Sequence, residues 1–256
     1  MKLLDHGSIE LIETWGSDER IVEAARMSTG KGFLGWGPNH APSCGYVGML
    51  DDPQRGCTCG GKTTPGDEKL LRYLYENHHA TPFEMAGAIF EVKAPIFVFR
   101  EWHRHRTQSY NEMSARYTPL PNENYIPTVD RLLNRGIGQA NHPQNKQASG
   151  TGTQLTEAYA EKFRKRLVET YRVQEELYQD ALDVGVPKEL ARVHLPVGRY
   201  SRMRASANLR NWLGFMTLRS DSKAQWEIRQ FSLALGSLLA ERFPRTMALF
   251  NEKRDA

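Results

Sequence analysis

The residues from Arg104 to Tyr117 constrain this chain more than any other stretch, because they are almost entirely polar and yet follow an apolar segment. That preceding segment, Pro95-Ile-Phe-Val-Phe-Arg-Glu-Trp-His, is apolar enough to be buried. The polar stretch reads Arg-His-Arg-Thr-Gln-Ser-Tyr-Asn-Glu-Met-Ser-Ala-Arg-Tyr, and its few apolar residues recur at neither helical nor strand spacing. A buried element is therefore predicted to carry a dense polar cluster to a site.

The chemistry of this cluster favours an anionic ligand, because arginine offers a fixed fork of donors that matches phosphate or carboxylate. Arg104, His105 and Arg106 are consecutive, so they cannot all face one way on a regular element. They would more easily contact two ligands, or two parts of one ligand. Glu112 can accept a hydrogen bond from a sugar hydroxyl or a base edge, and Ser114 adds a neutral hydroxyl. A solvated charged face or a structural salt-bridge network is the alternative interpretation.

Composition limits the classes of protein that the chain can belong to. Its 256 residues are 39% hydrophobic, which suits one globular domain with a real core. The net charge of +4 is mild; it suits small anionic substrates and does not demand nucleic acid. The sequence contains no long apolar run, so no membrane span is predicted. No signal peptide is expected at the N-terminus. Three cysteines, an odd number, favour a reducing compartment, so we expect a cytoplasmic protein.

Hydrophobic spacing predicts a mixture of helices and strands. Strands are expected at residues 8–14, 86–92 and 199–207. Helices are expected from Ser17 to about Ser28 and at 67–77, 95–103, 154–183 and 208–219, with a last helix from about Ile228 to Leu238. The helix at 154–183 repeats apolar residues every four positions and is interpreted as core scaffold. Residues 78–84 are expected to form a loop that lines a polar site, because Pro82 blocks helix continuation.

A segment rich in glycine, proline and cysteine occupies residues 30–66. His40, Cys44, Cys57 and Cys59 within it could bind a structural zinc ion. The spacing Cys-x-Cys differs from the usual Cys-x2-Cys of a zinc knuckle, and the single histidine is weakly placed. We therefore favour an insertion loop with free thiols over a metal site.

The central motif resembles the signature of the flavin-dependent thymidylate synthases. That signature is carried here by Arg104-His105-Arg106, seven residues, and then Ser114-Ala115-Arg116. The fuller string Arg-His-Arg-x-x-Ser-x-Asn-Glu-x-Ser-x-Arg-Tyr is also present, and a match of this length is far more specific than a lone glycine pattern. Further similar motifs are His-x-Thr-Pro-Phe-Glu from His79, Ala-Arg-x-x-Leu-Pro around Arg192, and the segment from Asn208 to Arg219.

The resemblance implies a set of site residues. Those that would contact the flavin are Ser28, which follows Arg26 at the end of the first helix, His79, Thr81, Glu84, Arg104, His105, Arg106, Glu112, Asn208 and Arg210. Those that would contact the nucleotide are Arg104, Glu112, Ser114, Ala115, Arg116, Arg192 and Arg219. Arg219 matches the arginine that faces the uracil ring, and it is the residue expected to be catalytic.

Three positions depart from the family pattern. Met85 stands where relatives often carry a histidine, so any role of that histidine is in doubt. Gly214 stands where they often carry a histidine or an asparagine, so that flavin contact should be absent or replaced by water. Glu101 stands where many relatives carry a glutamine that contacts the nucleotide. A carboxylate there would repel a phosphate unless Arg104 neutralised it or it turned away.

The resemblance also implies fold, reaction and assembly. The fold is α+β, with a central, mostly antiparallel sheet flanked by long helices, in a single domain with loop-rich insertions at about 30–66 and 118–153. The reaction is reductive methylation of dUMP to dTMP, with 5,10-methylenetetrahydrofolate as carbon donor and FAD reduced by NADPH. The assembly is a homotetramer with FAD at subunit interfaces. No Gly-x-Gly-x-x-Gly or Walker loop is present, so arginines and loops would hold the cofactor.

Two other functions remain open at this point. The first is a basic RNA- or DNA-binding protein that uses the arginine-rich stretch, for which salt-dependent affinity would be the sign. The second is a catalytically silent relative, suggested by Met85, Glu101 and Gly214. A thiol nucleophile is not indicated, because none of the three cysteines lies in a matched motif.

Overall fold

The structure is a computed structural model that describes residues 1–37, 39–40, 63–64, 66–135 and 155–255. The chain divides into two compact units, each assembled from separate stretches of sequence. The first unit comprises Met1–Thr14, Ala88–Ala207 and Asn211–Leu238, and the second comprises Trp15–Gly87, Asn208–Arg210 and Leu239–Ala256. The expectation of a single domain stays a prediction.

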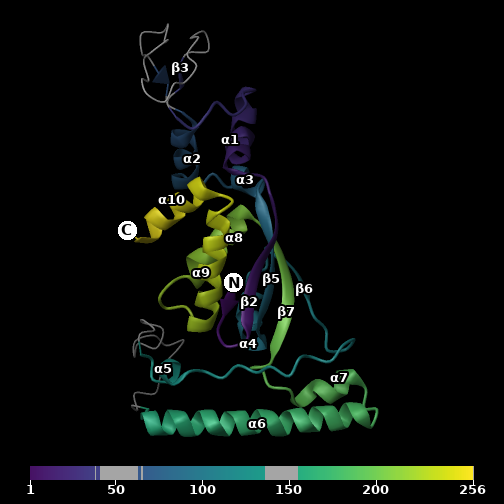
Figure 1. The fold of residues 1–256 in the computed structure, drawn as a ribbon. Coiled ribbons are helices and arrows are strands. Elements are labelled where there is room, and N and C mark those ends of the chain that lie inside the picture. The colour runs from purple at the N-terminus through teal and green to yellow at the C-terminus, as the bar shows by residue number, and fades with distance from the viewer. Residues whose placement is uncertain (38, 41–62, 65, 136–154, 256) are drawn as a thin grey trace. The chain divides into compact units, whose positions relative to one another are not determined.

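A five-stranded antiparallel sheet forms the centre of the first unit, in the order β1-β2-β5-β7-β6 (Figure 1). Its strands are β1 (Lys2–Leu3), β2 (Gly7–Trp15), β5 (Gly87–Pro95), β6 (Ser109–Glu112) and β7 (Tyr200–Asn208). Along β5, Ala88, Phe90, Val92 and Ala94 are buried, and the residues between them are partly exposed. This two-residue period leaves one face of the sheet for the core. The predicted α+β fold with a mostly antiparallel sheet is confirmed.

Aromatic side chains join three helices of the first unit in the core. The helices of this unit are α4 (Ile96–Trp102), α5 (Val129–Leu132), α6 (Glu157–Asp183), α7 (Lys188–Ala191), the 3-10 helix η3 (Arg192–His194), α8 (Leu209–Arg219) and α9 (Trp226–Ala240). The Trp102 ring centroid lies 4.6 Å from that of Phe215 and 6.3 Å from that of Phe231, so these rings join α4 to α8 and α9. The Trp212 indole donates a hydrogen bond to the Ala88 carbonyl at 3.0 Å, which ties α8 to β5. The last turn of α4 is therefore anchored in the core.

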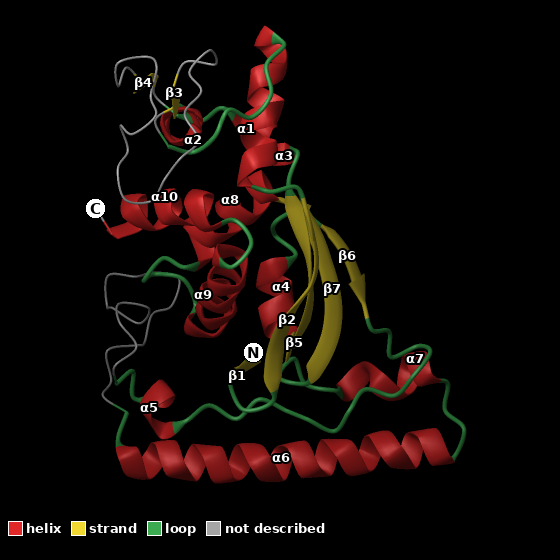
Figure 2. Cartoon of the chain, turned by 45° about the horizontal axis from the view of Figure 1, so that its top comes forward, coloured by secondary structure: helices red, strands yellow, loops and turns green. Residues whose placement is uncertain are grey.

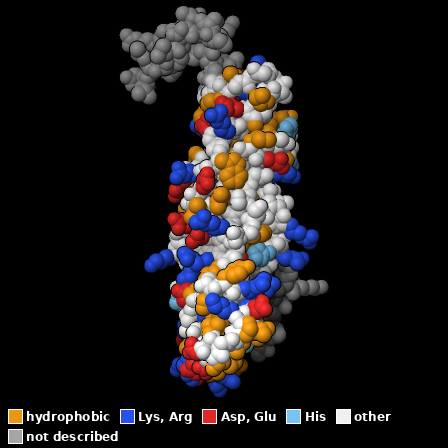
Figure 3. Space-filling view, turned by 90° about the vertical axis from the view of Figure 1, so that its right-hand side faces the viewer, with side chains coloured by type: hydrophobic (Ala, Val, Ile, Leu, Met, Phe, Trp, Pro, Cys, Tyr) orange, Lys and Arg blue, Asp and Glu red, His pale blue; other side chains and the backbone are white. Residues whose placement is uncertain are grey.

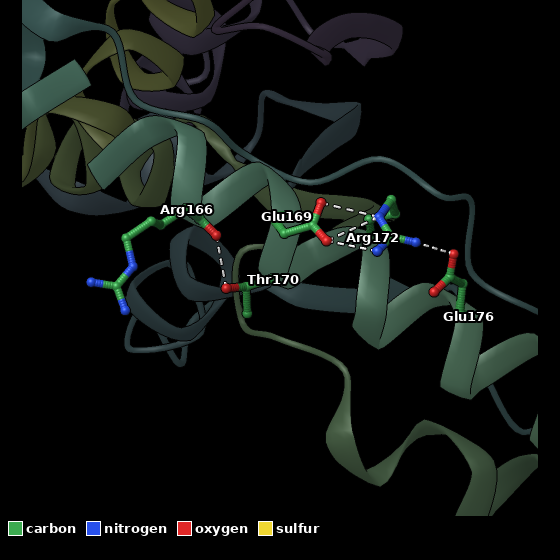
Figure 4. Close-up of polar contacts among 5 residues, drawn as sticks. All are labelled: Arg166, Glu169, Thr170, Arg172 and Glu176. Carbon is green, nitrogen blue, oxygen red and sulfur yellow. Dashed lines mark hydrogen bonds and ion pairs between the residues drawn. The ribbon is translucent and has the colours of Figure 1, made fainter. Parts of the chain in front are cut away.

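The long helix α6 lies across the ends of the strands in both ribbon views (Figures 1 and 2). Thr156 caps its N-terminus by accepting a hydrogen bond from the Tyr159 amide. Of its 27 residues only Ala160 and Tyr178 are buried, whereas Tyr159 and Phe163 of the predicted apolar stripe are exposed. The interpretation of this stripe as core is wrong for the single chain. On its solvent side, Arg172 bridges Glu169 and Glu176 by ion pairs one helical turn apart (Figure 4).

The second unit is built from short helices and two very short strands. They are α1 (Asp18–Arg26), the 3-10 helix η1 (Met27–Thr29), β3 (Asn39–His40), β4 (Thr63–Thr64), α2 (Asp67–Glu76), α3 (Ala80–Glu84) and α10 (Pro244–Asp255). Ser17 caps α1 as predicted, and Gly30 ends η1 with the left-handed φ of 64° that glycine tolerates best. The buried Asp18 carboxylate accepts hydrogen bonds from the Thr246 amide and hydroxyl and so caps α10. The sequence pattern does not predict α10, because its cap is supplied by a residue far away in the chain.

The predicted loop at residues 78–84 is wrong in part, because α3 forms there. Pro82 is the third residue of that helix. The first amides of a helix have no intrahelical acceptor, so a proline in the first turn removes no hydrogen bond. His79, the residue before α3, has the extended backbone of an N-cap.

Much of the two predicted insertions lies outside the described residues. In the first insertion, β3 pairs antiparallel with β4, while Cys44, Cys57 and Cys59 lie outside the described residues and His40 is described only as part of β3. In the second, Thr128 caps the short helix α5. Within the described ranges no cluster of histidine, cysteine, aspartate or glutamate could hold a metal ion. None of the helices seen there combines the length and apolarity needed to cross a lipid bilayer.

Candidate functional site

The turn after α4 separates the three consecutive basic residues of the central motif. His105 is half-buried and its ring packs 4.8 Å from Phe215, whereas Arg104 and Arg106 are exposed. Within the described part of the chain, the Arg104 and Arg106 guanidinium groups have no hydrogen-bond or ion-pair partner. The three side chains therefore lie in different environments within this turn. Two arginine forks are thereby left available for an anion.

Arg219, at the end of α8, is held by the last turn of α4 and the residues that follow. Its Nη1 donates to Glu101 Oε2 at 2.7 Å, its Nη2 to the Glu101 carbonyl at 3.1 Å, and its Nε to His105 Nε2 at 3.0 Å. The Glu101 carboxylate is therefore neutralised by Arg219 and not by Arg104. Arg219, the residue expected to be catalytic, therefore forms an ion pair with Glu101, one of the three positions that depart from the family pattern.

The bond from Arg219 fixes the protonation state of His105. A guanidinium group always donates, so His105 Nε2 must be the acceptor and the ring must be neutral with its proton on Nδ1. Burial and the positive charge of Arg219 lower the pKa of His105 to about 4. At neutral pH the ring is therefore an uncharged support for Arg219.

This protonation state predicts how stability depends on pH. The unfolded chain binds a proton at His105 below its ordinary pKa of about 6.5, whereas the folded chain binds it only near pH 4. Stability conferred by the neutral ring is therefore complete above pH 6.5 and is lost as pH falls toward 4. Because the ring is only half-buried, we expect a loss of about 1–2 kcal/mol across this window.

The measurement is the free energy of unfolding between pH 7 and pH 4.5, for the wild-type protein and for His105→Gln. Glutamine can still accept a hydrogen bond from Arg219 but takes up no proton. The wild-type protein should lose about 1–2 kcal/mol more than the variant over this range. If the free energy of unfolding fell equally with pH in the wild type and in His105→Gln, His105 would not be held neutral in the folded protein.

A cavity of about 480 Å³ in the first unit gathers three residues expected to bind the nucleotide, Glu112, Ala115 and Arg192. A volume of this size suits a small-molecule ligand. Arg100 and His103 also line the cavity but were not among the predicted site residues. Ile96, Phe99 and Arg100 of α4 and its C-cap residue His103 are spaced i, i+3, i+4 and i+7, so the helical period was the signal that could have found them.

Ser114 and Arg116, also expected to bind the nucleotide, lie in the turn after β6. The Ser114 hydroxyl accepts a hydrogen bond from the Arg116 amide at 3.3 Å, and Tyr117 and Thr118 donate to the Ser114 carbonyl. The Arg116 side chain is exposed and forms a long ion pair with Glu189 at 3.5 Å. Glu189 also lines the cavity, so this exposed pair lies at its edge. An exposed pair of this length is weak and can open for an anion.

The remaining residues expected to contact flavin belong to the second unit. Arg210 forms an ion pair with Glu84 at 2.5 Å, which brings two of them together. The Ser28 hydroxyl donates to the Ala25 carbonyl, and His79 and Thr81 are exposed at the start of α3. Asn208 is the last residue of β7 and lies two positions before Arg210 in the sequence.

Arg26 has a structural partner. Its guanidinium group pairs with the buried Asp67 carboxylate, which also accepts a hydrogen bond from the Leu34 amide at 2.6 Å. Asp67 therefore fixes both the end of α1 and the segment that follows η1. Arg26 serves here to hold this part of the second unit.

Two departures from the family pattern are open to solvent. Met85 is exposed at the end of α3. Gly214 lies inside α8, and a Cβ atom built there would meet nothing within 4 Å. Packing within the described residues therefore does not require glycine at position 214, because a larger side chain would fit there.

Comparison with known proteins identifies the family. The sequence model of the family described as "Thymidylate synthase complementing protein" matches residues 10–245. A flavin-dependent thymidylate synthase of Thermosipho africanus is 35% identical over 97% of this chain and 92% of its own length. One from Thermus thermophilus is 37% identical over 98% of this chain and 77% of its own length. A crystal structure of the UMP/dUMP methylase PolB from Streptomyces cacaoi, bound with 5-Br dUMP, superposes with a TM-score of 0.73 at 30% identity, covering 98% of this chain and 97% of that one.

These matches extend well beyond the central motif and include almost every element of both units. The chain therefore belongs to the flavin-dependent thymidylate synthase family.

Proposed function

We propose that this protein methylates dUMP at C5 to form dTMP, with one carbon from 5,10-methylenetetrahydrofolate and reducing electrons from NADPH by way of FAD. The observation that carries the proposal is the cavity that brings Glu112, Ala115 and Arg192 together. Arginine and glutamate suit the phosphate and the hydroxyl groups of a nucleotide. The solved methylase bound to 5-Br dUMP supports the substrate class.

The chain's own residues would mainly position and polarise the substrate. The uracil C5 atom is a poor nucleophile, and a fixed donor beside a ring carbonyl stabilises the negative charge that develops there. Arg219 is such a donor, because Glu101 and His105 hold its guanidinium group in place. Arg104, Arg116 and Arg192 would fix the phosphate, and much of the rate would come from this positioning.

The donor set also fits FAD. In the first unit, the exposed guanidinium groups of Arg104 and Arg106 suit its pyrophosphate. In the second unit, the hydroxyl groups of Ser28 and Thr81 and the carboxylate of Glu84, which pairs with Arg210, suit the sugar and ring edges. When bound, the flavin would supply the hydride.

The proposal is tested by the absorption spectrum of the purified protein, followed by anaerobic addition of NADPH. We expect flavin absorption bands that NADPH bleaches faster when dUMP is present. A protein that neither carries FAD nor can be reconstituted with it would contradict the proposal. Bound flavin that bleaches, without dTMP formation in the complete mixture, would indicate the catalytically silent relative.

Replacing Arg192 by alanine should raise the KM for dUMP by about 10- to 100-fold and change kcat much less. The KM should rise because a hydrogen bond to a charged group contributes about 1.5–3 kcal/mol. The kcat should change less because Arg192 lines the cavity but does not belong to the hydrogen-bond network of Arg219. Steady-state kinetics with varied dUMP provides the measurement. Arg166→Ala, which removes an exposed arginine of α6 (Figure 4), is the matched control and should leave KM unchanged. Equal KM values for Arg192→Ala and the control would remove Arg192 from the site.

We also propose a homotetramer, which the surface of α6 supports. Tyr159, Phe163, Val173 and Leu177 of this helix are exposed in the single chain. Apolar side chains gathered on one helix commonly mark a protein interface. Light scattering at micromolar concentration should give four times the chain mass of 29.2 kDa, and a monomeric mass would contradict this proposal.

We also propose a cytoplasmic location. The chain has a mild net charge and an odd number of cysteines, which favours a reducing compartment.

Nucleic-acid binding is less well supported. On the face seen in Figure 3, lysine and arginine side chains are interspersed with acidic and apolar ones instead of forming a broad basic patch. Binding to nucleic acid is driven by clustered positive charge and weakens steeply with salt. We therefore propose no nucleic-acid partner.

A further inference from the structure

Glu101 makes two different bonds to Arg219, and this sets it apart from an ordinary ion-pair partner. Its side-chain Oε2 accepts from Nη1 at 2.7 Å and its backbone carbonyl accepts from Nη2 at 3.1 Å. The backbone carbonyl is fixed by the last turn of α4, which Trp102 anchors in the core. Glu101 therefore restrains both terminal nitrogens of the guanidinium group from one rigid place.

His105 completes the restraint at the third nitrogen by accepting from Nε. A guanidinium group carries five N–H donors in a plane, two on each terminal nitrogen and one on Nε. The three bonds use one donor of each nitrogen and leave one free donor on Nη1 and one on Nη2. With the plane fixed by three acceptors, the two remaining donors have fixed directions as well.

We propose that Glu101 is a positioning residue for Arg219, which orients the two remaining donors of the guanidinium group toward the pyrimidine ring of the substrate. This inference rests on the proposed function. It assigns Glu101 a role through Arg219 and not a contact with the nucleotide phosphate. It also explains how a carboxylate is tolerated near an anionic substrate, because its charge is matched by Arg219 at 2.7 Å.

A positioning role has a different consequence from a charge role. The negative charge of Glu101 opposes the developing charge that Arg219 would stabilise, so the carboxylate helps only by fixing geometry. A neutral acceptor of the same shape should therefore serve as well. A misdirected donor, by contrast, loses much of its effect on the transition state, which is sensitive to shifts of about 1 Å.

The experiment compares Glu101→Gln and Glu101→Ala in steady-state dTMP formation. Glutamine keeps an oxygen for Nη1, and kcat should stay within about threefold of the wild-type value. Alanine removes that acceptor, and kcat should fall by about 10- to 100-fold with a change in the KM for dUMP below about threefold. Glu161→Ala, which removes an exposed glutamate paired with Arg164 on α6, is the control and should change neither constant.

A second readout follows the guanidinium group directly. Exchange of the Arg219 Nε proton with water, measured by NMR of arginine-labelled protein without substrate, should be slow in the wild type and in Glu101→Gln and at least tenfold faster in Glu101→Ala. If Glu101→Ala does not fold, Glu101→Met takes its place, because it fills similar volume without an oxygen acceptor. Equal losses of kcat in the glutamine and alanine variants would overturn the proposal, as would unchanged kcat or unchanged exchange in the alanine variant. Wild-type protein that forms no dTMP would count against the proposed function, while the exchange measurement would still decide whether Glu101 holds Arg219.

Discussion

Replacing Arg219 by alanine is expected to lower kcat for dTMP formation by about 10²- to 10³-fold. This is the range observed when one preorganised donor to a developing negative charge is removed. The guanidinium group is mostly buried, with 19% of its side chain exposed, and three acceptors hold it, so it needs little reorganisation when the reaction begins. The loss should be in kcat and not mainly in the KM for dUMP, because the interaction strengthens as charge develops.

Arg219→Lys separates charge from geometry. Lysine keeps the positive charge but lacks the planar fork that Glu101 and His105 grip, so we expect most of the loss to remain. Arg202→Ala is the matched control, because it breaks an ion pair with Glu91 on the exposed side of β7. Its kinetic constants should match the wild type. Full activity of Arg219→Ala would show that the uracil ring is polarised by another group.

Replacing Arg199 by alanine is expected to destabilise the fold by about 3–5 kcal/mol. Arg199 is 1% exposed and pairs with Glu175 of α6 at 2.5 Å, and its Nη2 donates to the Leu120 carbonyl at 3.0 Å. Removing one partner of a buried pair leaves the other charge uncompensated, which accounts for a loss of this size. The same bonds tie the segment after the Ser114–Arg116 turn to α6, so the change should also disturb the cavity.

Chemical denaturation at one fixed protein concentration measures this effect, because assembly would otherwise shift the midpoint. Arg172→Ala, which breaks the exposed pairs with Glu169 and Glu176 on the same helix (Figure 4), should leave the midpoint almost unchanged. Adding Glu175→Leu to Arg199→Met should recover much of the lost stability, because two apolar groups need no charge partner. A loss below about 1 kcal/mol for Arg199→Ala would contradict this account of the buried pair.

Local pattern predicted those parts of the fold that local forces determine. The two-residue period of β5, the serine cap of α1 and the apolar helix α4 all follow from neighbouring residues, and the structure has each of them. By contrast, α10 is capped by Asp18, which lies 228 positions before Thr246. The α6 stripe has the spacing of a core helix, but spacing cannot distinguish burial within one chain from burial between chains.

In the candidate site, too, features carried by neighbouring residues were predicted, and contacts between distant residues were not. The dense motif from Arg104 to Arg116 marked a ligand site without any structure, and the cavity with Glu112 and Ala115 is consistent with it. Neither the bond between Arg219 and His105, 114 positions apart, nor the pairing of Glu101 with Arg219 could be derived from spacing. The sequence suggests Arg104 as the residue that would neutralise Glu101, because Arg104 is near in the chain. Tertiary packing of α4 against α8 selected Arg219 instead.

The most direct test of the proposed function is chromatographic detection of dTMP after anaerobic incubation of the protein with FAD, dUMP, 5,10-methylenetetrahydrofolate and NADPH. We predict that dTMP forms in the complete mixture and that omission of the folate or of NADPH abolishes it. Arg219→Ala should form dTMP far more slowly under the same conditions. Absence of dTMP from the complete mixture, with flavin bound and the protein folded, would contradict the assignment of this chain as an active thymidylate synthase.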